Sequence, residues 1–252
     1  MRKIKVIGLQ NKIRVAAVSY LNTKPLIYGF EKGMMKKEVD LLIDYPSKIA
    51  SMLLKNEVDI GLVPVAIIPE MKEHCIISDY CIGSEGEVAS VCLFSEVPLN
   101  EIKIVLLDYQ SRTSAALLKL LIKEYWKLDV AFENTAGDYQ SEITGTTAGL
   151  VIGDRALKQR KVSSYIYDLG LEWKNFTGLP FVFAAWVSNK KLSDDFIYRF
   201  NEANMFGLNN LDTVISGYNK VPFDLKQYYT RNIKYNLDDC KLNALQIFLD
   251  KM

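Results

Sequence analysis

The hydrophobic pattern of the first part of the chain alternates between strand-like and helix-like segments. Short runs of apolar and β-branched residues predict strands, and apolar residues at a spacing of three and four predict helices. The predicted strands are Ile13–Val18, Asp40–Tyr45, Asp59–Val65, Ile76–Ile82 and Val88–Ser95, with helices at Pro25–Lys32 and Pro46–Asn56. A strand-helix-strand alternation of this kind predicts parallel strands joined by right-handed crossovers.

The alternation restarts further along the chain. Strands are predicted at Lys103–Leu107, Val130–Phe132, Ala148–Ile152 and Phe181–Ser188, and helices at Ser111–Trp126, Asp154–Gln159, Asp194–Asn209, Leu211–Gly217, Asp224–Thr230 and Asp239–Lys251. The restart predicts an α/β protein of two lobes with a ligand cleft between them. Residues 1–92 and 187–252 are expected to form the first lobe and residues 93–186 the second. The apolar runs Val88–Ser95 and Phe181–Ser188 are expected to cross between the lobes.

Composition narrows the class of protein. With 252 residues and 49% hydrophobic residues, the chain is long and apolar enough for a sizeable core. Its 31 basic and 30 acidic residues give a formal charge of +1 without a basic cluster, which argues against a nucleic-acid partner. No apolar run approaches the roughly 18 residues of a membrane span. Met1–Lys5 is basic, but the apolar stretch after it is too short for a signal peptide, so a cytoplasmic protein, monomeric or homodimeric, is expected.

The residues that most often carry chemistry are scarce. His74 is the single histidine, in a charged stretch that predicts an exposed helix end, and this excludes multi-histidine metal sites. Cys75, Cys81, Cys92 and Cys240 lack zinc-binding spacing and are expected to be reduced, buried thiols. Phosphate-loop and dinucleotide-binding patterns are absent as well. These residues therefore give no sign of a multi-histidine or zinc site, nor of a site for a dinucleotide.

Polar residues interrupt the pattern at four places next to predicted strand ends. These segments are Ser19–Thr23, Gly83–Ser90, Ser111–Ser114 and Thr177–Pro180. Ligands of open α/β sheets bind at the carboxyl ends of strands, and the free N–H groups at a helix start bind anions. For this reason we predict that Ser19, Thr177 and Gly178 bind the substrate. Each segment is also explained by a capped turn that binds nothing.

Three further groups have two interpretations each. Ser111, Thr113 and Ser114 with Arg112 form the best local anion site, since Arg112 offers a fork to a carboxylate, but an N-cap with Arg112 in solvent explains them equally. Asp154 follows a predicted strand and is a catalyst or an N-cap. Glu85 and Glu87 either supply a catalytic base or are carboxylates of a surface loop without a chemical role. Phe181, Phe183 and Trp186 are expected to pack in the core or along the crossing strand, and the alternative for one of them is the wall of a pocket for a flat ligand.

The ordered set of these segments resembles the chorismate dehydratases of the futalosine route to menaquinone. The matching segments are Val18–Leu26, Asp44–Ser47, Asp59–Pro64, Val88–Ser95, Ser111–Ser114, Ile152–Asp154 and Thr177–Trp186. Each one alone is a weak signal, and the specificity lies in their order over most of the chain. The loop Gly83–Val88 departs from the family pattern, which tends to have proline where Glu87 stands, so the position of Glu87 relative to the cleft stays open.

The resemblance implies a fold, a reaction and a set of residues. The fold is a type II periplasmic-binding-protein fold used as a cytoplasmic enzyme. The reaction is loss of water from chorismate to give 3-[(1-carboxyvinyl)oxy]benzoate, without metal or organic cofactor. The residues implied at the cleft are Asn22, Ser84, Ser90, Ser111, Thr113 and Asp154.

We assign roles to these residues as hypotheses. Ser111, Thr113 and Ser114 hold one substrate carboxylate, and Ser84 and Ser90 hold the other carboxylate or the hydroxyl. Asn22 hydrogen-bonds the leaving hydroxyl or orients the ring. The base is Asp154, Glu87 or the substrate's own side-chain carboxylate. Two alternatives share the fold: a binding protein without catalysis, and the sister enzyme that makes 1,4-dihydroxy-6-naphthoate. The sister enzyme tends to have a Ser-Pro-Cys-Pro-Asn-Asp-Thr-like segment where this chain has Ser-Tyr-Leu-Asn-Thr.

Overall fold

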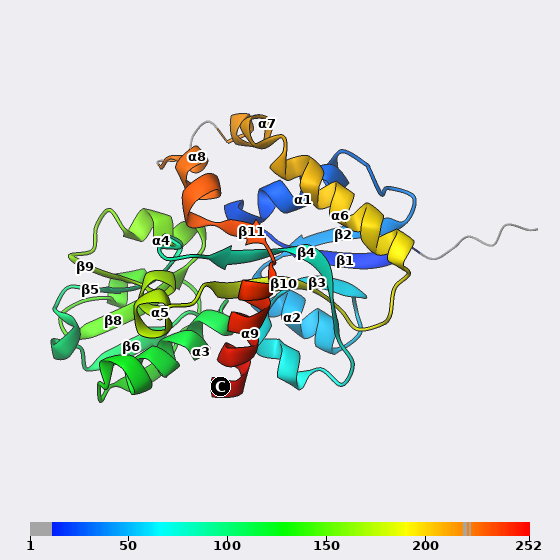
Figure 1. The fold of residues 1–252 in the computed structure, drawn as a ribbon. Helices are drawn as coiled ribbons and strands as arrows, with labels where there is room; N and C mark the ends of the chain where they lie inside the picture. The colour runs from blue at the N-terminus through cyan, green and yellow to red at the C-terminus, as the bar shows by residue number, and fades with distance from the viewer. Residues whose placement is uncertain (1–11, 219–220, 222) are drawn as a thin grey trace, which may run out of the picture.

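Two β-sheets, each flanked by helices, form two lobes that lie side by side (Figure 1). The computed structural model describes residues 12–218, 221 and 223–252. The basic start of the chain, expected not to be a signal peptide, lies outside the described residues. The predicted two-lobed α/β architecture is confirmed. Most predicted elements are present, with bounds that shift by a few residues.

The first lobe contains a six-stranded mixed sheet in the order β11-β4-β10-β3-β1-β2. Its strands are β1 (Ile13–Val18), β2 (Val39–Asp44), β3 (Ile60–Pro64), β4 (Cys75–Ser84), β10 (Phe181–Ser188) and β11 (Lys234–Asn236). The strands β2 and β3 pair in parallel with β1, as the alternation predicts, whereas β10 runs antiparallel to both β3 and β4. The carboxyl end of β1 therefore points out of the sheet toward the second lobe.

The central strand β10 is buried along its whole length. One face packs on α6 (Asp194–Leu208), where the Trp186 indole lies 5.0 Å from the Phe200 ring and donates to Asn204 Oδ1 at 2.9 Å. The other face packs on α9 (Asp239–Lys251), where Phe181 and Phe248 lie 4.8 Å apart. Because helices cover both faces, this strand is continuously apolar and does not alternate.

The second lobe contains a five-stranded sheet in the order β7-β6-β8-β5-β9. Its strands are β5 (Val91–Ser95), β6 (Ile104–Leu107), β7 (Ala131–Asn134), β8 (Thr147–Ile152) and β9 (Tyr165–Asp168). The other helices of the structure are α1 (Lys24–Glu31), α2 (Pro46–Leu54), α3 (Thr113–Leu120), α4 (Asp154–Gln159), α5 (Leu169–Thr177), α7 (Leu211–Ser216) and α8 (Leu225–Gln227), with shorter turns η1 (Leu21–Thr23), η2 (Val65–Glu70), η4 (Leu121–Trp126) and η6 (Tyr228–Asn232). The carboxyl ends of β6 and β8 lead into α3 and α4 beside the first lobe.

The sheets to which β5 and β10 belong do not agree with the expected lobe boundaries at residues 92/93 and 186/187. The strand β5 pairs in the second sheet with β8 from Val91 and with β9 from Cys92, and every described pairing of β10 is with β3 or β4 in the first sheet. A strand needs its ladder partners about 4.8 Å away along its length, so neither apolar run divides between two sheets. We therefore propose that the chain crosses between the lobes at residues 85–90 and 178–180.

The hydrophobic pattern of the sequence did not predict β9, α5 and β11. The edge strand β9 is half exposed and short, and such a strand gives little hydrophobic signal. Asp168 ends β9 and caps α5 through the N–H groups of Gly170 and Leu171, and the same carboxylate accepts from Val88 and Ala89 at 3.0 and 2.7 Å. One buried carboxylate thus holds a helix start and the first crossing segment together.

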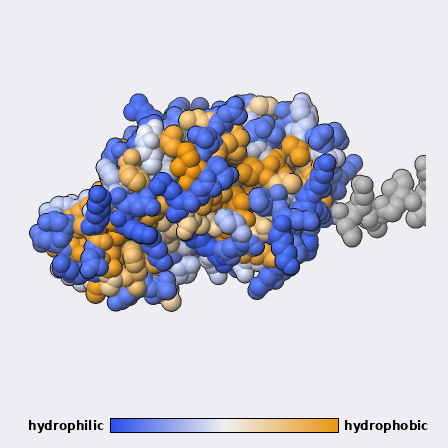
Figure 2. Space-filling model, turned by 60° about the horizontal axis from the view of Figure 1, so that its bottom comes forward, coloured by the Kyte–Doolittle hydropathy of each residue, from blue (hydrophilic) through white to orange (hydrophobic). Residues whose placement is uncertain are grey.

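The surface gives no sign of a membrane-spanning element in the described part of the chain. None of its helices is long and apolar enough to span a bilayer. Hydrophilic side chains cover much of the face in Figure 2, with hydrophobic patches between them. Cys81 and Cys92 are buried as expected, whereas Cys75 and Cys240 are exposed, since both lie at element ends rather than in a core.

Candidate functional site

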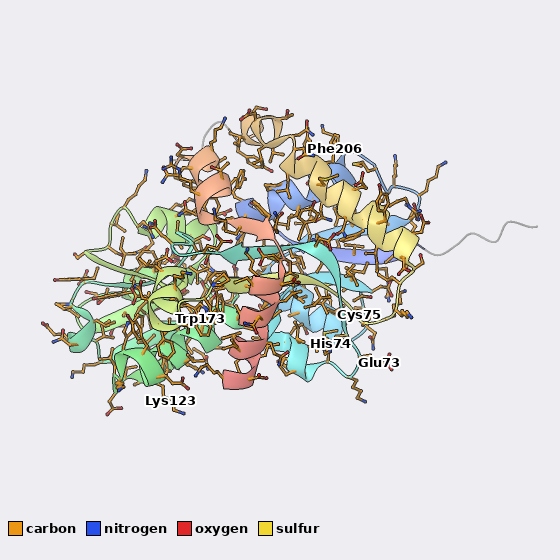
Figure 3. The ribbon with its side chains drawn as sticks, in the orientation of Figure 1. Glu73, His74, Cys75, Lys123, Trp173 and Phe206 are labelled. Carbon is orange, nitrogen blue, oxygen red and sulfur yellow. The ribbon has the colours of Figure 1, made fainter. Side chains whose placement is uncertain are left out.

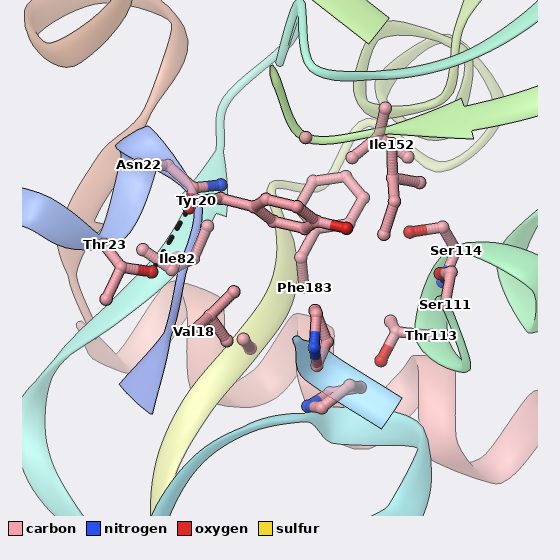
Figure 4. Close-up of a pocket in the computed structure, with 15 residues that line it drawn as sticks. Val18, Tyr20, Asn22, Thr23, Ile82, Ser111, Thr113, Ser114, Ile152 and Phe183 are labelled. Carbon is pink, nitrogen blue, oxygen red and sulfur yellow. Dashed lines mark hydrogen bonds between the residues drawn. The ribbon is translucent and has the colours of Figure 1, made fainter. Parts of the chain in front are cut away.

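A cavity of about 60 Å³ lies where the two lobes meet. Figure 4 shows Tyr20 and Asn22 on one side of it, with Ser111, Thr113 and Ser114 on the other. The full lining consists of Val18, Tyr20, Asn22, Thr23, Pro46, Pro64, Ile82, Val91, Ser111, Thr113, Ser114, Ile152, Gly153, Phe183 and Ala184. Such a volume holds water but falls below the roughly 300 Å³ of a typical ligand pocket. Residues of both lobes line this small cavity.

The first lobe contributes the turn that follows β1. Asn22 is buried in this turn, and its side-chain oxygen accepts from the Thr23 hydroxyl at 3.3 Å. Two tyrosines from the C-terminal part of the chain fix the backbone: Tyr229 donates to Leu21 O at 3.0 Å, and Tyr235 donates to Asn22 O at 2.9 Å. Residues more than 200 positions away thus hold the turn in place.

The second lobe contributes the start of α3. The Ser111 hydroxyl, one residue before the N-cap Arg112, accepts from the Ser114 N–H at 3.1 Å. The Thr113 side chain is buried, and its oxygen accepts from the Ala66 N–H of the first lobe at 3.1 Å. Three hydroxyls and the free N–H groups of a helix start therefore face the cavity from this lobe.

Hydrogen bonds from two further segments close the cleft. The Leu21 N–H in the first lobe donates to Asp154 Oδ1 in the second at 3.1 Å. The Tyr20 hydroxyl donates to Gln110 Oε1, an oxygen that also accepts from Arg155 at 3.1 Å. Arg155 pairs in turn with the buried Asp108 at 2.8 Å. A buried ion pair in the second lobe thus positions the acceptor for a tyrosine of the first.

The lining carries no charged side chain among the described residues. Asp154, which was predicted as a catalytic residue, lies outside the lining, and one of its oxygens accepts from the Leu21 N–H. Burial raises the pKa of Asp154, and that N–H acts in the opposite direction. The hydrogen-bond donors that the site offers to an anion are uncharged: hydroxyls, the Asn22 amide and backbone N–H groups. In the described part of the chain, no group of three or more His, Cys, Asp and Glu side chains is arranged to hold a metal ion.

Four of the residues predicted for the site line the cavity: Asn22, Ser111, Thr113 and Ser114. The structure places others elsewhere. Arg112 pairs with Glu70 at 3.2 Å and lies outside the lining. The Thr177 hydroxyl bonds back to Trp173 O at 2.8 Å, and Gly178 ends α5 with φ +75°, so this segment forms a helix C-cap.

The remaining predicted positions lie around the cleft rather than on its lining. Ser19 is exposed, and His74 is exposed on the turn before β4 (Figure 3). Ser84 and Ser90 are fully buried at the first crossing, where the Ser84 hydroxyl faces the backbone of Gly170 at the start of α5. Glu87 pairs with Arg160 and lies outside the lining. Glu85 pairs with the buried Lys241 at 2.8 Å.

Sequence reasoning missed the apolar part of the lining and the C-terminal tyrosines. Val91 begins β5 and Ile152 ends β8, so their positions were a signal, whereas Ile82 lies two residues before the end of β4. Phe183 lines the cavity, as one of three aromatic residues was expected to do. Nothing in the sequence pattern connects Tyr229 or Tyr235 to the turn at Asn22, because the contact depends on how the C-terminal segment returns to the first lobe.

Two lobes that close over a neutral, hydroxyl-rich cleft define a periplasmic-binding-protein-like fold. A solved protein from Archaeoglobus fulgidus superimposes with a TM-score of 0.77 at 17% identity, covering 95% of this chain and 96% of that one. A Candida albicans gene product described as having the generic periplasmic binding protein fold gives 0.63 at 14% identity, covering 96% and 90%. The aliphatic sulphonate binding protein of Escherichia coli gives 0.61 at 10% identity, covering 96% and 91%.

The chain belongs to the menaquinone biosynthesis family, whose model matches residues 13–252. It is a homologue of a chorismate dehydratase of Thermus thermophilus. The two chains are 28% identical over 230 residues, which cover 82% of this chain and 84% of the relative. The family that the ordered motifs predicted is thus confirmed.

Proposed function

We propose that this protein is a hydro-lyase that removes water from chorismate and forms 3-[(1-carboxyvinyl)oxy]benzoate. Membership of the menaquinone biosynthesis family and the likeness to a chorismate dehydratase support the reaction. The observation that carries the proposal is the lining itself, in which Asn22 faces the hydroxyl cluster of α3 across the cleft. A dicarboxylate with one ring hydroxyl fits such a set of neutral donors.

The reaction needs little from the protein in covalent terms. The C3–H bond breaks and its electrons form a ring double bond, while the C4–O bond breaks and hydroxide leaves as water with a proton. Aromatisation of the ring drives this elimination. The protein has to hold the substrate, assist the leaving hydroxyl and exclude bulk water. A cleft that closes through several hydrogen bonds meets the last requirement.

The residues divide between the two lobes. Ser111, Thr113, Ser114 and the N–H groups at the start of α3 hold one carboxylate, since this is where the helix dipole and free donors coincide. Asn22 donates from its side-chain amide to the leaving hydroxyl. Phe183, across the cavity from Ser111, supports the flat face of the ring.

The base that fits this arrangement best is the substrate's own side-chain carboxylate. No carboxylate lines the cavity among the described residues, and Asp154 is engaged with Leu21. A carboxylate on the enolpyruvyl ether lies within reach of the C3 proton by its covalent connection. Asp154 stays the protein alternative, because burial raises its pKa toward the range of a general base.

Incubation of the chelator-treated protein with chorismate tests the proposal. Chromatography with mass detection should show loss of one water and formation of an aromatic enolpyruvyl ether. Ser111→Ala with Thr113→Val should raise KM for chorismate, whereas Lys119→Ala, at an exposed position further along α3 and outside the lining, serves as the matched control and should leave it unchanged. Tight binding of chorismate without turnover would instead indicate a binding protein, and absence of both would overturn the substrate.

A further inference from the structure

A guanidinium lies just behind the uncharged lining of the cavity. Arg155 Nη2 donates to Gln110 Oε1 at 3.1 Å, and the same oxygen accepts from the hydroxyl of Tyr20, which lines the cavity. The other nitrogens of Arg155 make no hydrogen bond among the described residues, so the guanidinium keeps N–H donors that suit a carboxylate. A cation is thus one residue away from a site that we propose for a dicarboxylate.

Asp108 holds this guanidinium at the ends of β6 and β8. The Asp108 carboxylate is 2% exposed, and both of its oxygens accept from Arg155 Nη2, at 2.9 and 2.8 Å. The same two oxygens accept from the N–H groups of Gln110 and Ile152, at 3.0 and 3.1 Å. Because backbone N–H groups fix the carboxylate, it neutralises Arg155 at one defined place outside the lining.

A second arginine next to the lining is paired in the same way. Arg112 stands between the lining residues Ser111 and Thr113, and its guanidinium pairs with Glu70 at 3.2 Å. Arginine binds carboxylates more specifically than other side chains do, since its planar fork matches their two oxygens. Yet both arginines that lie within two positions of a lining residue are paired with a carboxylate of the protein and lie outside the lining.

The proposed reaction gives a reason for keeping a guanidinium away from the substrate. The substrate's side-chain carboxylate takes the C3 proton, and C3 adjoins C4, whose hydroxyl is the proposed partner of Asn22. The base therefore lies on the side of the cavity where Figure 4 shows Asn22 and Tyr20. A cation within about 4–6 Å lowers the pKa of a carboxylate by about 1–3 units, and a weaker base removes a proton more slowly.

We propose that Asp108 is a positioning residue that withholds the Arg155 guanidinium from the substrate, so that the substrate's side-chain carboxylate stays basic enough to take the C3 proton. The inference rests on the proposed function. Asp108 acts through Arg155 and lies outside the cavity lining. A released guanidinium binds the carboxylate and weakens it as a base, so loss of Asp108 combines tighter binding with slower chemistry.

Asp108→Asn tests the role, because an amide oxygen still accepts from a backbone N–H while the negative charge is removed. We expect the single-turnover rate with chorismate to fall about tenfold, in line with the lowered basicity. The product 3-[(1-carboxyvinyl)oxy]benzoate should bind several-fold more tightly in calorimetric titration. Single-turnover kinetics are needed because they separate the chemical step from the slower release of a tightly held product.

Removal of the guanidinium should rescue the slow variant. In the double variant with Asp108→Asn and Arg155→Gln, the single-turnover rate should return to within about threefold of wild type. Replacement of both members of a buried ion pair also costs less stability than loss of one. A double variant as slow as Asp108→Asn, or an Asp108→Asn protein with the wild-type rate, overturns the inference.

Asp59→Asn is the matched control. Asp59 is a buried carboxylate that pairs with Arg14 at 3.0 Å and lies outside the lining, so its loss should lower Tm and keep the single-turnover rate. If Asp108→Asn does not fold, Arg155→Gln alone decides. A rate within about threefold of wild type supports the inference, and a loss of tenfold or more overturns it. A wild-type protein inactive on chorismate overturns the proposed function itself.

Discussion

The ring of Tyr20 lies directly against the backbone of Gly153. A Cβ atom at Gly153 would stand 2.8 Å from three carbons of that ring, closer than side chains approach one another in folded proteins. Tyr20 follows β1 in the first lobe, and Gly153 follows β8 in the second. The absence of a side chain at position 153 therefore lets the two lobes meet.

Gly153→Ala should weaken binding of the reaction product by about tenfold or more, because the closed cleft no longer forms without displacing Tyr20. The backbone at Gly153 has φ +65° and ψ −146°, a region that costs other residues about 1–3 kcal/mol, so Tm should fall as well. Calorimetric titration with 3-[(1-carboxyvinyl)oxy]benzoate measures the binding.

Gly145→Ala is the matched control for that variant. Gly145 has a positive φ of +56°, but a Cβ there meets open space. It should lower Tm and leave product affinity at the wild-type value. Equal affinity for both variants would show that closure does not depend on the contact between Gly153 and Tyr20.

Tyr20→Phe should raise KM for chorismate about fivefold, because it removes the hydroxyl that bonds Gln110 across the cleft, a bond worth about 1 kcal/mol. Gln110→Ala removes the other partner and should have a similar effect. Steady-state kinetics of the two single variants and the double variant give the coupling. Losses that simply add would contradict a shared contact.

Asp154→Asn should keep most of the turnover, because an amide oxygen still accepts from the Leu21 N–H. Asp154→Ala removes that acceptor and should loosen the closed state, with a several-fold rise in KM. The comparison identifies the base: loss of about a hundredfold or more in kcat for both variants would assign proton abstraction to Asp154.

Stability should depend on Asp59 as the pH falls. Burial alone would raise the pKa of Asp59, but hydrogen bonds from Arg14 and the charge of Lys190 hold it well below the usual range. A carboxylate with a lowered folded pKa stabilises the protein above its unfolded pKa of about 3.9, and this contribution is lost as the pH falls further.

Thermal unfolding of Asp59→Asn across the pH range measures the effect. The variant should have a lower Tm than wild type between about pH 5 and 7, and the difference should shrink below about pH 4. Asp212→Asn, at an exposed pair with Lys226, is the control and should follow the wild-type curve. A difference that stays constant down to pH 2 would rule out titration of Asp59.

Much of the site could be predicted because its residues interrupt the local hydrophobic pattern. Asn22 and the cluster at Ser111 interrupt apolar runs at strand ends, where local pattern and ligand position coincide. Arg112 and Thr177 show the same kind of local signal and lie outside the lining, since one pairs with Glu70 and the other caps a helix. Polar residues after an apolar run indicate where a strand ends. They do not indicate which partner each side chain will have, because this depends on the packing around it.

The sequence by itself determined the alternation of strands and helices, the two-lobed class and the family, because these follow from local periodicity and from motifs in order along the chain. The tertiary structure decided which sheet receives β5 and β10, since ladder pairing joins segments that are distant in sequence. It also decided that the C-terminal tyrosines hold the turn at Asn22 and that Tyr20 meets Gly153. Those contacts join residues more than 100 positions apart, and no local pattern encodes them.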